Sequence, residues 1–299
     1  MVARLERHVR PPEVPEMLEV KDVMDVLLSE EVAKRLTHLA ETRAEEYQSV
    51  EPFPHIVIDD FLPPAPLAEA LRLFPAPRAL RWLDYDEATE RKLAFPVAEA
   101  LPRPMREVLH FLNTAPVLRF LETLTGITGL IPDPYFKGGG LHQIEPGGFL
   151  DVHADFNWYE KLKLDRRLNL LLYLNQDWQE EFGGHLELWD REMKACVKRV
   201  LPVFNRCVIF STTSTSYHGH PLPLTCPKGR TRQSIATYYY TNGRPAEEEQ
   251  GSHSTLFQAR PGAEAKGRPS RLRTVKKIAQ ALLPPIIADT YYRMRKPER

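Results

Sequence analysis

The spacing of apolar residues changes once along the 299-residue chain, from a helical period to an alternating one. In residues 15 to about 47, apolar side chains recur every three or four positions among charged ones, which predicts a helix. FPHIVIDDF (Phe53–Phe61) is rich in β-branched residues and predicts a strand. Residues 62–74 and 104–125 predict two further helical stretches, and Pro116 is expected to break or kink the second.

From Leu141 onward, short apolar runs are separated by loops that contain Gly, Pro and Asp, which predicts a β-sandwich or barrel. In RLNLLLYLN (167–175), leucines share one face of the strand. The other face carries Arg167, Asn169, Tyr173 and Asn175, with Leu171 as its one apolar residue. Such a polar face lies either against bulk water or inside a barrel, around a ligand. The upstream helices are able to cover the apolar face, so we favour a ligand cavity.

A candidate metal site begins at FLDVHAD. His153 and Asp155 are two positions apart, so a strand directs both to one face, together with Phe149 and Asp151. His218, in SYHGHP, is the natural third ligand because it lies 65 positions further on, far enough to re-enter a barrel. Two imidazoles and one carboxylate leave coordination positions open, as in non-haem iron oxygenases. The His-x-Asp pair alone is weak, since a packed core histidine and a turn aspartate explain it better than a metal site does.

The strand RQSIATYYY adds a second constellation, because Arg232, Ser234, Ala236 and Tyr238 share one face. An arginine inside a barrel is costly without a partner, and a dicarboxylate supplies one. The guanidinium binds a carboxylate through two parallel hydrogen bonds, to which Ser234 adds a hydroxyl. Tyr173 is able to donate to the same end of the ligand. This arrangement suits 2-oxoglutarate, whose far carboxylate would bind Arg232 while its 2-oxo acid end binds the iron.

The ordered motifs HAD (153–155), YLNQDW (173–178), FGGHLELW (182–189), His218–Gly219 and RQSIATYYY resemble the prolyl-hydroxylase-like branch of the 2-oxoglutarate- and Fe(II)-dependent oxygenases. The resemblance covers about residues 141–241, with a weaker match around FPHIVIDDF. It implies a double-stranded β-helix (jelly roll), so a mainly β fold with helical cover.

The resemblance also implies roles for residues. It implies iron ligation by His153, Asp155 and His218, and co-substrate binding by Arg232 and Tyr173. Ser234 matches the Arg-x-Ser pattern of other branches only. His220 competes with His218 as third ligand, and the His–Gly at the end of a strand favours His218.

The implied reaction uses Fe(2+), 2-oxoglutarate and O2, with ascorbate as a candidate reductant, and releases succinate and CO2. Halogenases of this superfamily lack the carboxylate ligand, so Asp155 favours hydroxylation. The expected substrate is a prolyl or other protein side chain, and a small molecule, sugar or lipid is the alternative. Two readings rank lower: a non-catalytic jelly-roll binding protein, and a zinc hydrolase, which does not explain Arg232.

The charge balance and the cysteine content argue against several classes of protein. Lys+Arg and Asp+Glu number 40 each, so the whole chain has no nucleic-acid or membrane-surface signature. The three cysteines do not form a disulfide framework. No signal peptide is expected, and no apolar run reaches the roughly 20 residues of a membrane span. We therefore expect a soluble, cytoplasmic protein.

The expected organisation has three parts. These are an N-terminal helical extension (1–50), the oxygenase domain (51–243, motif core 141–241), and a linker with a basic helical tail (244–299). From residue 258 onward there are eleven Lys/Arg against three Asp/Glu. A solvated helix face explains this tail better than an RNA or partner surface does, so it remains a weak candidate for binding.

Overall fold

The computed structural model describes residues 22–248 and 251–262. Its helices are α1 (Val23–Leu27), α2 (Glu30–Ser49), α3 (Pro64–Arg72), α4 (Arg103–Phe111) and α5 (Ala115–Thr125), with the short 3-10 turns η1 (Ala98–Ala100), η2 (Glu180–Phe182) and η3 (Ala246–Glu248). Within the described residues, no helix has the length and apolar character needed to cross a bilayer.

The described part of the first predicted helix is two helices rather than one. The chain leaves the helical conformation around Ser29, whose side chain accepts a hydrogen bond from the backbone N–H of Val32 and so caps α2. The stretch 104–125 is also divided, as predicted. Pro116 lies in the first turn of α5, where no intrahelical N–H is required. The predicted basic tail helix lies outside the described residues.

The strands are β1 (His55–Ile58), β2 (Leu83–Asp86), β3 (Glu90–Phe95), β4 (Ile131–Pro132), β5 (Gly140–Ile144), β6 (Phe149–Ala154), β7 (Trp158–Tyr159), β8 (Leu164–Tyr173), β9 (Leu186–Trp189), β10 (Cys196–Val200), β11 (Cys207–Ser211), β12 (His218–His220), β13 (Arg232–Thr241) and β14 (Leu256–Phe257). Neighbours pair antiparallel in the order β1-β11-β8-β13-β5-β3-β6-β12-β9-β10. The sheet curls into a jelly-roll barrel, which confirms the predicted fold class.

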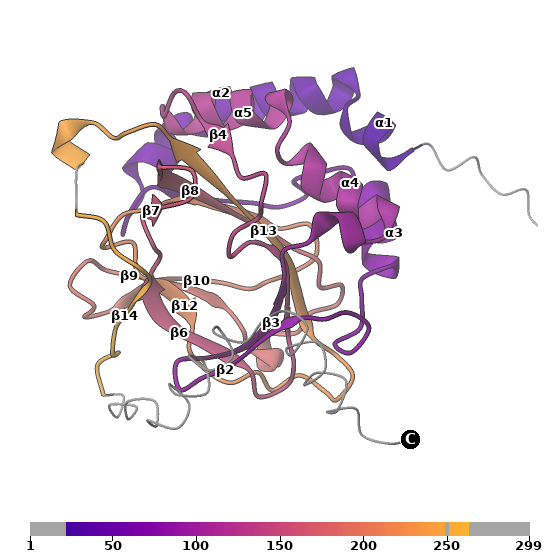
Figure 1. Ribbon diagram of the computed structural model, residues 1–299, viewed down its shortest axis with the longest axis vertical. Coiled ribbons are helices and arrows are strands. Elements are labelled where there is room, and N and C mark those ends of the chain that lie inside the picture. Colours follow the sequence, from indigo (N-terminus) through magenta and orange to yellow (C-terminus); the bar gives the residue numbers. More distant parts are fainter. Residues whose placement is uncertain (1–21, 249–250, 263–299) are drawn as a thin grey trace, which may run out of the picture.

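The leucine face of β8 and the helices form one hydrophobic core. Leu168, Leu170 and Leu172 are fully buried and belong to the same cluster as Leu36 of α2 and Phe120 of α5. Figure 1 shows the helices gathered on one side of the barrel, over β8 and β13. The apolar face of β8 is therefore covered by helices, and its other face is turned into the barrel.

Two elements were not foreseen from the sequence. The β2–β3 hairpin lies in a segment with only weak alternation, and β3 bridges β5 and β6. Strand β14 lies in the stretch predicted to be linker, and it pairs with β6 through Leu256 opposite Ala154 and Phe257 opposite His153. Both elements border the cavity described next.

Candidate functional site

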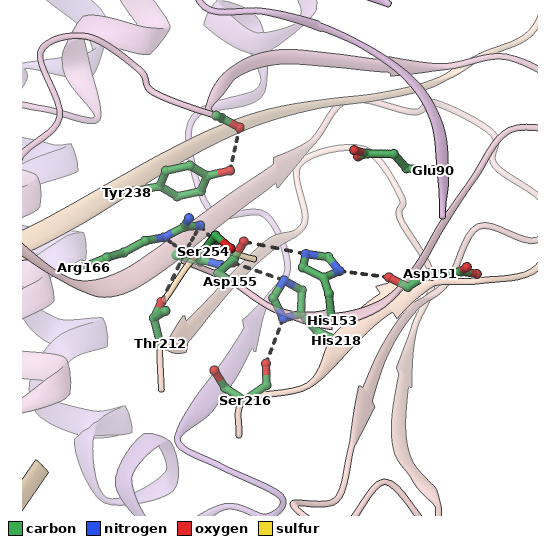
Figure 2. A network of polar contacts seen from close by, with 12 residues as sticks. Glu90, Asp151, His153, Asp155, Arg166, Thr212, Ser216, His218, Tyr238 and Ser254 are labelled. Carbon is green, nitrogen blue, oxygen red and sulfur yellow. Dashed lines mark hydrogen bonds and ion pairs between the residues drawn. The ribbon is translucent and has the colours of Figure 1, made fainter. Parts of the chain in front are cut away.

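Three residues from two adjacent strands converge inside the barrel, as predicted. His153 and Asp155 come from β6 and the residue after it, and His218 comes from β12. Nε2 of His153 lies 3.6 Å from Oδ1 of Asp155, and Nε2 of His218 lies 3.4 Å from Oδ2. The candidate ligand atoms all lie within 4.8 Å of one another, and all three side chains are buried. Figure 2 shows the two rings and the carboxylate turned toward one point.

The pairing of β6 with β12 brings the histidines together. His153 is directly opposite His218, but His220 is opposite Leu150, so the register shifts between the two pairs. This irregularity corrects one prediction. Leu150 lines the cavity with His153, whereas Phe149 and Asp151, expected on that face, do not. Alternation fails here because a bulge places two successive residues of one strand opposite a single residue of its partner.

Both histidines present the same ring nitrogen to the cavity. Nδ1 of His153 lies 2.9 Å from the backbone oxygen of Asp151, and Nδ1 of His218 lies 2.9 Å from that of Ser216. A carbonyl oxygen only accepts, so each Nδ1 carries the proton and each Nε2 offers a lone pair. Burial lowers the pKa of His153, and His218 lowers it further, which favours the neutral imidazole that a metal requires. The residues therefore fit a divalent metal with nitrogen and oxygen ligands.

Asp155 is held by two donors from β8. Nη2 of Arg166 and Nδ2 of Asn169 donate to its Oδ2 over 2.9 and 2.6 Å. Burial alone would raise the pKa of Asp155. The charge of Arg166, together with contacts from both histidines, outweighs burial and holds that pKa well below its usual range. The carboxylate is ionised, and Oδ1, the oxygen nearer to His153, accepts no hydrogen bond from Arg166 or Asn169.

Arg166 was missed by the sequence analysis, which directed Arg167 into the barrel instead. The pairing of β13 with β8 shifts between Tyr239–Leu168 and Tyr240–Arg166, so Arg167 is the extra residue of a bulge. Arg167 binds Thr241 and Glu248 instead. The Arg-Arg doublet was a signal that one guanidinium faces inward, but alternation selected the wrong one.

The predicted co-substrate residues lie in the same cavity of about 510 Å³ as the triad. Arg232 is 5% exposed. Its Nε donates to the backbone oxygen of Gly184 and its Nη2 to the hydroxyl of Tyr173, over 2.8 and 3.2 Å. Ser234 lies directly opposite Tyr173 in the sheet and lines the cavity beside Arg232. Among the described residues, no carboxylate forms an ion pair with Arg232, so its charge has no protein counter-ion.

His220 lines the cavity but is not part of the triad cluster. Its ring is 4% exposed, and neither ring nitrogen has a hydrogen-bond partner among the described residues. Burial and the neighbouring charges of Arg232 and Lys92 hold the pKa of His220 well below its usual range, so the imidazole is neutral. The geometry thus groups His218, rather than His220, with His153 and Asp155.

Elements absent from the sequence prediction line the rest of the cavity. Glu90 and Lys92 of β3 contribute an ion pair of 3.0 Å. From β14, the ring of Phe257 lies 5.4 Å from that of His153. Burial and the charge of Lys92 lower the pKa of His142, a cavity residue of β5, to about 3.

The comparisons with known proteins agree with one another. Residues 139–241 match the 2OG-Fe(II) oxygenase superfamily. The chain is 25% identical over 196 residues to the prolyl 3-hydroxylase OGFOD1 of Mus musculus, a match that covers 64% of this chain and 33% of the mouse protein. The chain thus spans about one third of the length of that curated relative.

Two solved prolyl hydroxylases resemble this chain. One is the Trichoplax adhaerens enzyme bound to a hypoxia-inducible-factor peptide, with a TM-score of 0.52 at 17% identity over 72% of this chain and 95% of the other. The other is a Pseudomonas putida prolyl-4-hydroxylase, with a TM-score of 0.47 at 18% identity over 68% of this chain and 100% of the other. At these identities the Trichoplax likeness supports the fold alone. The superfamily match over residues 139–241 and the buried His-Asp-His cluster support the predicted resemblance to the prolyl-hydroxylase-like 2-oxoglutarate- and Fe(II)-dependent oxygenases.

Proposed function

We propose that the protein hydroxylates a substrate C–H bond with Fe(II), 2-oxoglutarate and O2, and that His153, Asp155 and His218 are the iron ligands. The observation that carries this proposal is the pairing, in one cavity, of a buried His-Asp-His cluster with the uncompensated guanidinium of Arg232. When bound, the iron supplies the redox chemistry, in which O2 gives one oxygen atom to succinate, formed with loss of CO2, and one to the substrate hydroxyl.

The chain's own residues hold and orient the reactants. The two Nε2 atoms and the carboxylate of Asp155 would hold the metal as three ligands, which would leave its remaining coordination sites open. Arg232 keeps N–H groups that have no acceptor in the described part of the chain, and with these it binds the far carboxylate of 2-oxoglutarate. Because Tyr173 accepts a hydrogen bond from Arg232, its own proton remains to be donated to the same carboxylate. Ser234 adds a third donor there.

The proposed substrate is a prolyl or other side chain of a protein, with ascorbate as reductant. Its support is the similarity to a prolyl 3-hydroxylase and the fold shared with a peptide-binding prolyl hydroxylase. The cavity also opens past Leu83 and Tyr135, both about half exposed, which offer an apolar rim to a polypeptide.

The central experiment measures succinate formation by the purified protein with Fe(II), 2-oxoglutarate and ascorbate, without added substrate. Because uncoupled decarboxylation of 2-oxoglutarate requires no second substrate, we expect wild-type protein to release succinate. Arg232→Ala is expected to abolish turnover. The matched control is Arg230→Ala, two positions earlier, whose guanidinium donates outside the cavity to the backbone oxygen of Gln176. The proposal would be overturned if the wild-type protein did not bind the co-substrate.

Substrate class is tested separately. Proline-containing peptides and a metabolite panel are incubated with the enzyme, and products are examined by mass spectrometry for the gain of one oxygen atom. Stimulated succinate release with peptides, together with that gain on a proline, supports a prolyl hydroxylase. Stimulation by small molecules alone refutes the protein-substrate part of the proposal and leaves the reaction class standing.

A further inference from the structure

His220 is a buried side chain whose hydrogen-bonding capacity the proposed mechanism has not used. Both of its ring nitrogens are without partners among the described residues, although the ring is only 4% exposed. Burying a polar group without a hydrogen bond is unfavourable. Such a group in a binding cavity is satisfied by water or by the ligand, so His220 points to a ligand contact.

The position of His220 relates it to the far end of the co-substrate. It lies two residues after His218 on the same strand, and both line the cavity. Arg232 lines the same cavity as His220. His220 is therefore placed in one cavity with both the candidate metal ligands and the guanidinium of Arg232.

His220 also borders a second cavity, of about 20 Å³, whose lining includes Gly184, His185 and Glu187. That volume has room for one water molecule. One ring nitrogen is thus able to pair with water on this side while the other faces the main cavity. A neutral imidazole has one N–H and one lone pair in either tautomer, so it is able to donate into the cavity without being protonated.

We propose that His220 donates a hydrogen bond to the far carboxylate of 2-oxoglutarate, next to Arg232 and Tyr173. This inference rests on the proposed function and adds to it a specificity residue for a dicarboxylate over a monocarboxylate. A carboxylate accepts about four hydrogen bonds. The other donors proposed for the far carboxylate are Arg232, Tyr173 and Ser234, which all line the cavity, so one more donor can be accommodated. His220 would add a fourth donor to this group, from β12.

The test uses 2-oxoglutarate and 2-oxopentanoate, which has the same chain length but lacks the far carboxylate. Each is titrated into the full-length Fe(II)-loaded protein without oxygen, and Kd is measured by calorimetry. The variants are His220→Leu, which removes both ring nitrogens, and His220→Gln, which retains an N–H donor. His55→Leu removes a buried histidine of β1 outside the cavity and is the matched control.

We expect His220→Leu to raise the Kd for 2-oxoglutarate about tenfold, as loss of a hydrogen bond to a charged group predicts. The Kd for 2-oxopentanoate should change less than about twofold, and His220→Gln should restore most of the affinity for the diacid. The inference is overturned if His220→Leu leaves the affinity for 2-oxoglutarate unchanged, or if it weakens both ligands equally. If wild-type protein binds no 2-oxoglutarate at all, the proposed function itself has failed.

Discussion

Nη2 of Arg166 donates a 2.9 Å hydrogen bond to Oδ2 of Asp155, and the guanidinium carbon lies 3.4 Å from the centre of the Tyr238 ring. Figure 2 shows Arg166 approaching the carboxylate from the side away from His153. The arginine is 1% exposed, so its charge acts on Asp155 with little screening by water. This contact holds the carboxylate in place beside the two histidines, and it keeps the group ionised.

The first prediction concerns that contact. Arg166→Gln should weaken binding of Mn(II), a stand-in for Fe(II), by about 10–100-fold, because residues that orient metal ligands contribute this much. Arg167→Gln is the control, since Arg167 is equally long, adjacent and buried, but binds Thr241 and Glu248 outside the cavity. Both variants are expected to lose stability, and only Arg166→Gln should lose metal affinity in a calorimetric titration. Equal losses would contradict a specific contribution of Arg166.

The jelly roll and much of this site were readable from residue alternation. His153 and Asp155 share a face, and so do Arg232, Ser234 and Tyr238, because those parts of β6 and β13 have regular pleats. The prediction that the leucines of β8 pack against the helices was also correct. Period-2 reasoning succeeds where a strand is long, regular and buried on one side only.

Some features of the site could not be predicted from residue alternation. Two strands contain a bulge, and the β2–β3 hairpin and β14 have only weak sequence patterns. The bulge at Arg167 reverses the faces of the arginine doublet, and the shift opposite Gly219 brings Leu150 inward. A bulge is set by the partner strand, so the bulged sequence alone does not reveal it. β14 is two residues long and derives its position from pairing with β6, which no local pattern encodes.

A second prediction identifies the third metal ligand. His218→Ala should abolish Mn(II) binding as fully as His153→Ala does, because each removes one of three nitrogen and oxygen donors that converge on one point. His220→Leu should bind Mn(II) with wild-type affinity, since its ring is outside the cluster. Electron paramagnetic resonance of titrated Mn(II) measures the free ion. Retained binding in His218→Ala together with loss in His220→Leu would make His220 the ligand.

A third prediction concerns pH. His142 titrates at about 3 in the folded chain because of burial and the charge of Lys92, and near 6.5 when unfolded. Below pH 6.5 the unfolded state therefore binds more protons at this site, so the stabilising contribution present at neutral pH is lost as pH falls toward 3. The loss is at most about 1.4 kcal/mol per pH unit.

Urea unfolding of metal-free protein at pH 7 and pH 5 measures this effect. His142→Gln, which is not titratable, should lose less free energy of unfolding between the two pH values than wild type does, by about 1–2 kcal/mol. Other buried histidines contribute equally to both proteins and cancel in the difference. Identical losses would show that His142 is not held neutral by the fold.

The last prediction tests the register shift that pairs His218 with His153. A Cβ added at Gly219 would lie 2.9 Å from the backbone oxygens of both Leu150 and Asp151, and neither is able to swing away as a side chain would. Gly219→Ala should therefore push β12 from β6, lowering the free energy of unfolding by about 1–3 kcal/mol and weakening Mn(II) binding, because His218 moves with the strand. Gly251→Ala is the control, since a Cβ there meets nothing within 4 Å. Chemical denaturation and metal titration of both variants decide the matter: if Gly219→Ala behaves like Gly251→Ala, the close approach of β6 and β12 is not what sets the geometry of the two histidines.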